Sequence, residues 1–160
     1  MNRDRVLRRL EEEWTAFTAS YDGLDERTLL IAGVTGSWSI RDIIAHVTWW
    51  EEEALTHVPH LLAGGRAPRY SVTYGGIDAF NALMTERKRA LSLAEVFREQ
   101  DDTHRRLIAL VEHLPEPALA GDSRVRRRLR LDTYGHYPTH AKAIRRWRAH
   151  RQRVHAEDPH

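Results

Sequence analysis

Hydrophobic residues recur every three or four positions along several stretches of the chain, with charged residues between them. The first stretch, residues 3–21, has its hydrophobic positions at Val6, Leu7, Leu10, Trp14, Phe17 and Tyr21. This period is typical of a helix that buries one face. The same period predicts a second helix from Ser39 to about residue 63, and Ser39 with Asp42 forms an acidic variant of the capping box at its start.

Two further long helices are predicted in the second half of the chain. Ser92 and Glu95 form a capping box, and the helix that they start ends at Pro115. The last helix is predicted from about Gly135 to His150. Residues 77–89 favour a short helix, whereas residues 66–76 are expected to form a loop and residues 117–132 a connector.

Four amphipathic helices without an alternating strand pattern predict an all-α protein, a four-helix bundle. The long segment between the second and third helices allows a crossover that contains a short extra helix or a lid, to which Tyr70 and Tyr74 could belong. A chain of 160 residues fits one domain. We expect that domain to span residues 1–151 and residues 152–160 to be a frayed tail.

Composition excludes several classes of protein. The chain has no Cys, which rules out disulfides and thiolate metal sites. It has no apolar run of about 18 residues, as a membrane span requires, and its first residues do not read as a signal peptide. The formal net charge of +2 gives no argument for nucleic acid. The sequence therefore predicts a cytoplasmic protein with no nucleic-acid or membrane partner.

The segment from Arg124 to Arg130 concentrates positive charge, with five Arg in seven residues. It lacks the interleaved aromatic residues and the fold motifs of a nucleic-acid interface. We expect a solvated connector. The alternative is that one or two of these Arg hold the carboxylates of a thiol cofactor or of an acidic substrate.

Three His residues carry the candidate chemistry. His136 and His140 are four residues apart, so a helix places them on one inward face, and Pro138 then falls in its first turn, where a missing N–H costs little. His46 lies on or beside the inward face of the second helix. Buried imidazoles need partners, and a divalent metal with three His ligands and an open position would satisfy all three. Zinc, nickel, iron and manganese all fit such ligands; the alternative is that each His is an ordinary packed residue.

These motifs resemble a known family. Residues 38–46 match the W-S-x-x-D/E-x-x-x-H segment that opens helix two in the DinB-like four-helix-bundle superfamily, and residues 136–140 resemble the H-x-x-x-H of its last helix. Residues 78–81 and 133–137 are closer to its ClbS/DfsB-like branch. The resemblance extends from about residue 3 to residue 151.

The resemblance implies a divalent metal site at His46, His136 and His140 and frequent homodimers. Relatives include transferases and isomerases that use mycothiol, bacillithiol or glutathione as the thiol. The ClbS branch implies protection against a genotoxin by opening of a reactive cyclopropane, and that branch does not always keep the three His.

Other residues are candidates for roles around the metal. Glu53 could accept a hydrogen bond from a ligand His or act as a base, and Tyr134 could donate a proton. Trp50, Asn81 and Tyr137 are expected to contact a substrate. The alternative for each of the five is packing, capping or solvent exposure.

Together these observations predict an enzyme that acts on a small electrophilic substrate by thiol transfer or hydrolysis, where metal binding lowers the pKa of the nucleophile. Two alternatives stay open. One is a ClbS-like protein that binds or neutralises a reactive small molecule without an obligatory metal. The other is a dimeric scaffold in which the His residues are structural.

Overall fold

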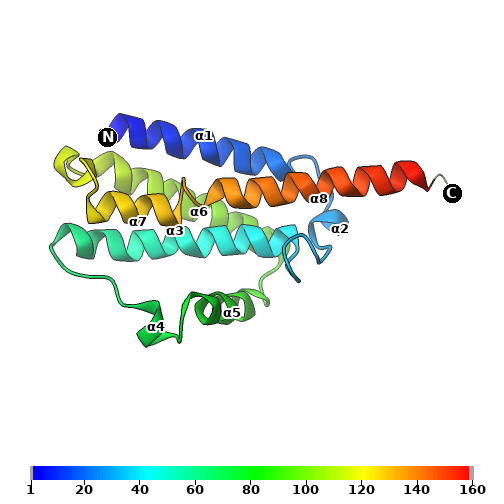
Figure 1. Cartoon of the computed structure of the whole chain (residues 1–160), viewed down its shortest axis with the longest axis horizontal. Helices are drawn as coiled ribbons and strands as arrows, with labels where there is room; N and C mark the ends of the chain where they lie inside the picture. Colours follow the sequence, from blue (N-terminus) through cyan, green and yellow to red (C-terminus); the bar gives the residue numbers. More distant parts are fainter. Residues whose placement is uncertain (1, 159–160) are drawn as a thin grey trace.

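The structure is a computed structural model that describes residues 2–158, and within this range it is helical and has no strand. Three long helices, α1 (Arg3–Tyr21), α3 (Ile40–Leu62) and α6 (Leu93–His113), run side by side (Figure 1). The fourth position is filled by two helices that follow each other end to end, α7 (Arg124–Asp132) and α8 (Tyr137–Glu157). The predicted all-α four-helix bundle is confirmed, with a break in its last helix.

The helix starts lie where the sequence predicts them. Ser39 and Asp42 make the reciprocal hydrogen bonds of a capping box at the start of α3, and Ser92 and Glu95 do the same for α6. Because a cap fixes the first turn, it also fixes which later residues face inward. The core is formed by the inward face of each long helix, including Leu10, Phe17, Ile43, Val47, Val96, Leu107, Val111 and Ile144.

The connector predicted for residues 117–132 is instead mostly helical. It contains a short 3-10 turn, η1 (Glu116–Leu119), and α7, which Ser123 caps. Val125 and Leu129, four residues apart, are buried and fix the inward face of α7. Two inward apolar positions among five Arg residues give too weak a periodic signal to reveal a nine-residue helix.

The last helix also differs in its bounds. α8 begins at Tyr137, two residues after the predicted start, and Pro138 lies in its first turn as expected. It continues to Glu157, beyond residue 151, where the sequence predicts a frayed tail.

The segment between α3 and α6 contains the short extra helix that was predicted. It is α5 (Ile77–Lys88), preceded by the single turn α4 (Tyr70–Thr73), and both lie outside α3 (Figure 1). The side chain of Phe80 is buried and joins α5 to the core. The remaining short helix, α2 (Glu26–Leu29), follows α1. None of the described helices is long and apolar enough to cross a membrane.

Candidate metal centre and its cavity

The three predicted His ligands meet between α3 and the start of α8. His46 and His140 are buried and His136 is half-buried. The Nε2 atom of His136 lies 3.0 Å from Nε2 of His46 and 2.9 Å from Nε2 of His140. One ligand atom from each of the three residues lies within 4.8 Å of the others. The structure therefore brings together the set that the sequence predicts.

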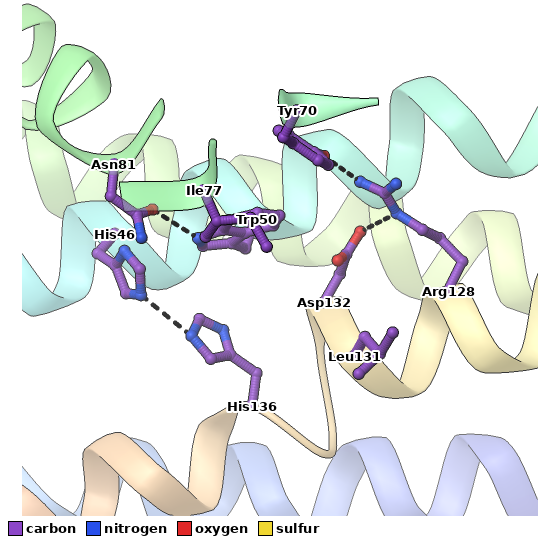
Figure 2. A pocket seen from close by; sticks show the side chains of 9 residues that line it. All are labelled: His46, Trp50, Tyr70, Ile77, Asn81, Arg128, Leu131, Asp132 and His136. Atoms are coloured by element: carbon purple, nitrogen blue, oxygen red, sulfur yellow. Dashed lines mark hydrogen bonds and ion pairs between the residues drawn. The ribbon is translucent and has the colours of Figure 1, made fainter. Parts of the chain in front are cut away.

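The break between α7 and α8 places His136 opposite α3. Residues 133–136 form a turn in which the amides of His136 and Tyr137 both donate to the carbonyl of Thr133. Gly135 is required there, because a Cβ atom on it would lie 2.6 Å from the carbonyl oxygen of Arg130. This turn redirects the chain, so that His136 projects toward His46 (Figure 2).

Burial keeps all three imidazoles neutral near pH 7. Burial, together with the other two His, lowers the pKa of His46 to about 2. Burial and His140 lower the pKa of His136 to about 3, and burial lowers the pKa of His140 to about 4. A neutral imidazole offers one nitrogen lone pair, which is the form that binds a metal.

The hydrogen-bonding pattern fits a metal better than it fits three packed His residues. Nε2 of His136 has one in-plane direction for a proton or a lone pair, so it cannot hydrogen-bond to two neighbouring nitrogens at once. The Nδ1 atoms of all three residues have no partner among the described residues, so the polar contacts of the three rings are made through Nε2. A cation that accepts the lone pairs of all three Nε2 atoms would let Nε2 of His136 face both other nitrogens without a hydrogen bond to either.

The distances agree with shared coordination. Two imidazole nitrogens that bind one metal at about 2.0–2.1 Å, with about 90–110° between the bonds, are about 2.8–3.4 Å apart. The separations of His136 from His46 and from His140, 3.0 and 2.9 Å, lie in this range, and the third pair lies within 4.8 Å. Aromatic rings surround His46, with the ring centroid of Trp38 at 4.6 Å and that of Trp49 at 4.9 Å.

A cavity of about 320 Å³ opens beside His46 and His136. Its apolar lining residues are Trp50, Ile77 and Leu131, which come from three different helices (Figure 2). Asn81 also lines it, and its Oδ1 accepts a hydrogen bond of 3.1 Å from Nε1 of Trp50. A volume of this size suits a small molecule.

Another part of the same cavity is polar. Tyr70, Arg128 and Asp132 line it, and Arg128 donates hydrogen bonds of 2.5 Å to both of the others (Figure 2). The hydroxyl of Tyr70 donates to Glu53 at 2.7 Å, and Glu53 also contacts His57 at 3.1 Å. Burial raises the pKa of Asp132 to about 7, although Arg128 opposes the shift. This carboxyl group can therefore gain or lose a proton near neutral pH.

The other predicted site residues lie in different places. Trp50 and Asn81 line the cavity, as expected of substrate contacts. Glu53 does not line the cavity. It accepts a hydrogen bond from Tyr70 and lies 3.8 Å from Arg128, two residues that do line it. Tyr134 is buried with a hydroxyl that has no partner among the described residues, and Tyr137 is fully buried against Glu51. Neither tyrosine is part of the cavity lining.

Sequence reasoning missed Asp132, Ile77 and Leu131 as cavity residues. It considered that an Arg of the 124–130 run could bind a ligand, and Arg128 is the one that lines the cavity. The available signal was the four-residue spacing of Arg128 and Asp132, which places the pair on one face of a helix. Using that signal required recognising α7 first.

Comparison with known proteins agrees with this architecture. The family model of the DinB superfamily matches residues 9–128, a range that contains His46 but neither His136 nor His140. No curated protein shows a significant sequence match to the chain. Among solved structures, "Sibling Lethal Factor Precursor - DfsB" has a TM-score of 0.78 and 18% identity over 94% of this chain and 97% of that one.

Two further solved structures share the fold. An uncharacterised protein from Escherichia coli UTI89 has a TM-score of 0.80 and 11% identity, over 94% of this chain and 95% of that one. The colibactin self-resistance protein ClbS, in complex with double-stranded DNA, has a TM-score of 0.77 and 11% identity, over 91% of this chain and 94% of that one.

The ClbS complex contradicts one prediction. The small net charge and the lack of nucleic-acid motifs predict no nucleic-acid partner, but a protein of this fold is found on a DNA duplex. That exclusion was wrong, because a local surface can bind DNA when the net charge of the whole chain is small. The predicted homodimer is not tested by a structure of one chain.

The superfamily model covers three quarters of the sequence, and the solved structures match nearly the whole helical fold. The chain belongs to the DinB superfamily.

Proposed function

We propose that this protein is a divalent-metal-dependent enzyme that acts on a small electrophilic molecule by thiol transfer or hydrolysis. The observation that supports this most is the convergence of three neutral imidazoles, those of His46, His136 and His140, beside a largely apolar cavity. Bound zinc, nickel, iron or manganese would lower the pKa of a coordinated water or thiol, which makes a nucleophile available near neutral pH. In the transfer reaction the co-substrate is a low-molecular-weight thiol of the mycothiol or bacillithiol type.

The side chains of the cavity supply the remaining steps. Trp50, Ile77 and Leu131 pack against the apolar part of the substrate and exclude water. The oxygen of Asn81 is engaged by Trp50, so its amide nitrogen is the group that can donate to a substrate carbonyl. Asp132 can hold or release the proton that the reaction moves.

Metal content of the tag-free protein tests the proposal. We expect about one divalent ion per chain in the wild type by mass spectrometry, and loss of it in His46→Ala, His136→Ala and His140→Ala. His60→Ala removes an exposed His from the far end of α3 and is the matched control that keeps the metal. The loaded protein should then consume free thiol or hydrolyse an ester in a substrate screen, and no uptake of zinc, nickel, iron or manganese by the wild type would refute the proposal.

A second candidate is protection against a reactive small molecule without an obligatory metal. It is favoured by the fold that the chain shares with a colibactin self-resistance protein. This function predicts tight small-molecule binding that persists after removal of the metal and in His140→Ala. Because that protein was solved on double-stranded DNA, a short DNA duplex belongs among the ligands tested.

A further inference from the structure

Glu51 is a fully buried acid on α3 that the proposed reaction does not use. Its Oε1 accepts a hydrogen bond from the hydroxyl of Tyr137 and lies 2.9 Å from Nδ1 of His104, whereas its Oε2 has no partner among the described residues. Burial raises the pKa of Glu51. Burying a carboxyl group with one unpartnered oxygen costs free energy, and the contacts of Oε1 with Tyr137 and His104 offset only part of that cost.

Tyr137 is the first residue of α8 and follows His136 directly. Its hydroxyl is fully buried and donates a hydrogen bond to Oε1 of Glu51. The start of α8 has no capping side chain that would fix it from within the helix. The side chain of Tyr137 therefore provides a direct hydrogen bond between the beginning of α8 and α3.

Two neighbouring contacts join α3 to α8. One is between His46 and His136, and the other is between Glu51 and Tyr137. His136 directly precedes Tyr137, and His140 lies in the same first turn of α8. The position of the tyrosine ring therefore sets how this turn is rotated and how far it lies from α3.

The acceptor is itself held in place. The His104 ring that contacts Glu51 stacks on the ring of Trp14 in α1, with centroids 3.7 Å apart and planes 5° from parallel. The Tyr137 ring lies 5.3 Å from Trp14. The cluster thus joins α1, α3, α6 and α8, and it gives Glu51 little freedom to follow a displaced helix.

We propose that Glu51 and Tyr137 are positioning residues of the three-His centre. Their hydrogen bond holds the first turn of α8 so that Nε2 of His136 and of His140 face His46. This inference rests on the proposed metal function and adds to it the residues that set its geometry. Groups that orient metal ligands without touching the metal typically change metal affinity by 10–100-fold when they are removed.

Zinc affinity, measured by competition with a chromophoric chelator, tests the inference. Tyr137→Phe removes only the hydroxyl, and Glu51→Met removes its acceptor, together with the contact to His104, while keeping a similar shape. The matched control is Tyr21→Phe, which removes a buried tyrosine hydroxyl that accepts a 2.7 Å hydrogen bond from Gln100, away from the His residues. We expect Tyr137→Phe and Glu51→Met each to weaken zinc binding about tenfold or more, and Tyr21→Phe to stay within about twofold of wild type.

The double variant adds a second criterion. If both residues act through one hydrogen bond, zinc binds the double variant about as weakly as it binds either single variant. If zinc binds Tyr137→Phe and Glu51→Met as tightly as it binds the wild type, this inference is overturned and the proposed function is not. The same holds if Tyr21→Phe weakens zinc binding as much as these two variants do. No zinc binding by the wild type would overturn the proposed function together with it.

Discussion

Arg128 donates a hydrogen bond from Nε to Oδ2 of Asp132 at 2.5 Å, in the wall of the cavity that His46 and His136 also line. The guanidinium offsets only part of the cost of burying this acid, because the pKa of Asp132 is still raised to about 7. The acid that exchanges a proton in the proposed reaction is also a source of instability when it is charged.

Asp132→Asn should reveal that cost as a dependence of stability on pH. An acid whose pKa is higher in the folded state than in the unfolded chain stabilises the fold below its unfolded pKa, and this contribution is lost as the pH rises through its folded pKa. Between pH 5 and pH 8 the free energy of unfolding of the wild type should therefore fall by about 2–3 kcal/mol relative to that of Asp132→Asn. Urea unfolding of both proteins across this range measures the difference.

The comparison with Asp132→Asn also removes the effect of the three His residues, whose lowered pKa values give the opposite slope in both proteins. A stability difference that stays constant from pH 5 to pH 8 would show that Asp132 is ionised throughout this range. Asp122→Asn, at an exposed acid just before α7, is the control and should give no pH-dependent difference.

Tyr70→Phe should loosen the segment that covers the cavity. The hydroxyl of Tyr70 donates to Glu53 and accepts from Arg128, and it is the polar link from α4 to the bundle. Loss of two hydrogen bonds to charged groups should cost about 1–3 kcal/mol of local stability. Limited proteolysis within residues 64–76 should then become at least about fivefold faster.

Tyr74→Phe is the matched control, because Tyr74 lies in the same segment and is exposed. Its digestion rate should match that of the wild type. Equal rates for all three proteins would mean that the Tyr70 hydroxyl does not hold this segment closed.

Arg41→Met should lower global stability by about 2–4 kcal/mol. The buried guanidinium of Arg41 donates to the carbonyls of Lys88 and Leu91 at 2.6 and 2.5 Å, and so ties the end of α5 to α3. Removing it takes the charged donor from two half-buried carbonyls, of which that of Lys88 keeps the backbone amide of Leu91. Arg89 is exposed and pairs with the exposed Glu86 three residues before it. Its replacement, Arg89→Met, is the control and should change the free energy of unfolding by less than about 0.5 kcal/mol.

The three-His cluster was largely predictable because local rules fix its members. The Ser39 capping box sets the start of α3 and so turns His46 inward, and the four-residue spacing of His136 and His140 places them together. The inward position of His46 and the need of buried imidazoles for partners joined it to His136, 90 residues away, and the family resemblance implied the same set. Local periodicity alone does not say which faces of two distant helices meet.

Glu51 shows why part of the site could not be predicted. It belongs to a run of three Glu residues, which reads as solvated, yet successive helical residues point about 100° apart. On a helix with neighbours on several sides, such a run cannot lie wholly in solvent, and here Glu51 is the member turned inward. Which of the three it would be depends on how α1, α6 and α8 pack around α3, and this is tertiary information.

Zinc should raise the melting temperature of the wild type and not that of His140→Ala. A ligand that binds only the folded state at 100 times its dissociation constant stabilises it by about 2.7 kcal/mol, which for a chain of this size is a shift of about 5–10 °C. A chelator should reverse the shift. His140 is buried, so His140→Ala should also lower the melting temperature of the metal-free protein. The comparison is therefore made for each protein with and without zinc. A shift of equal size in both proteins would place the zinc elsewhere, whereas a shift restricted to the wild type assigns it to the three His residues.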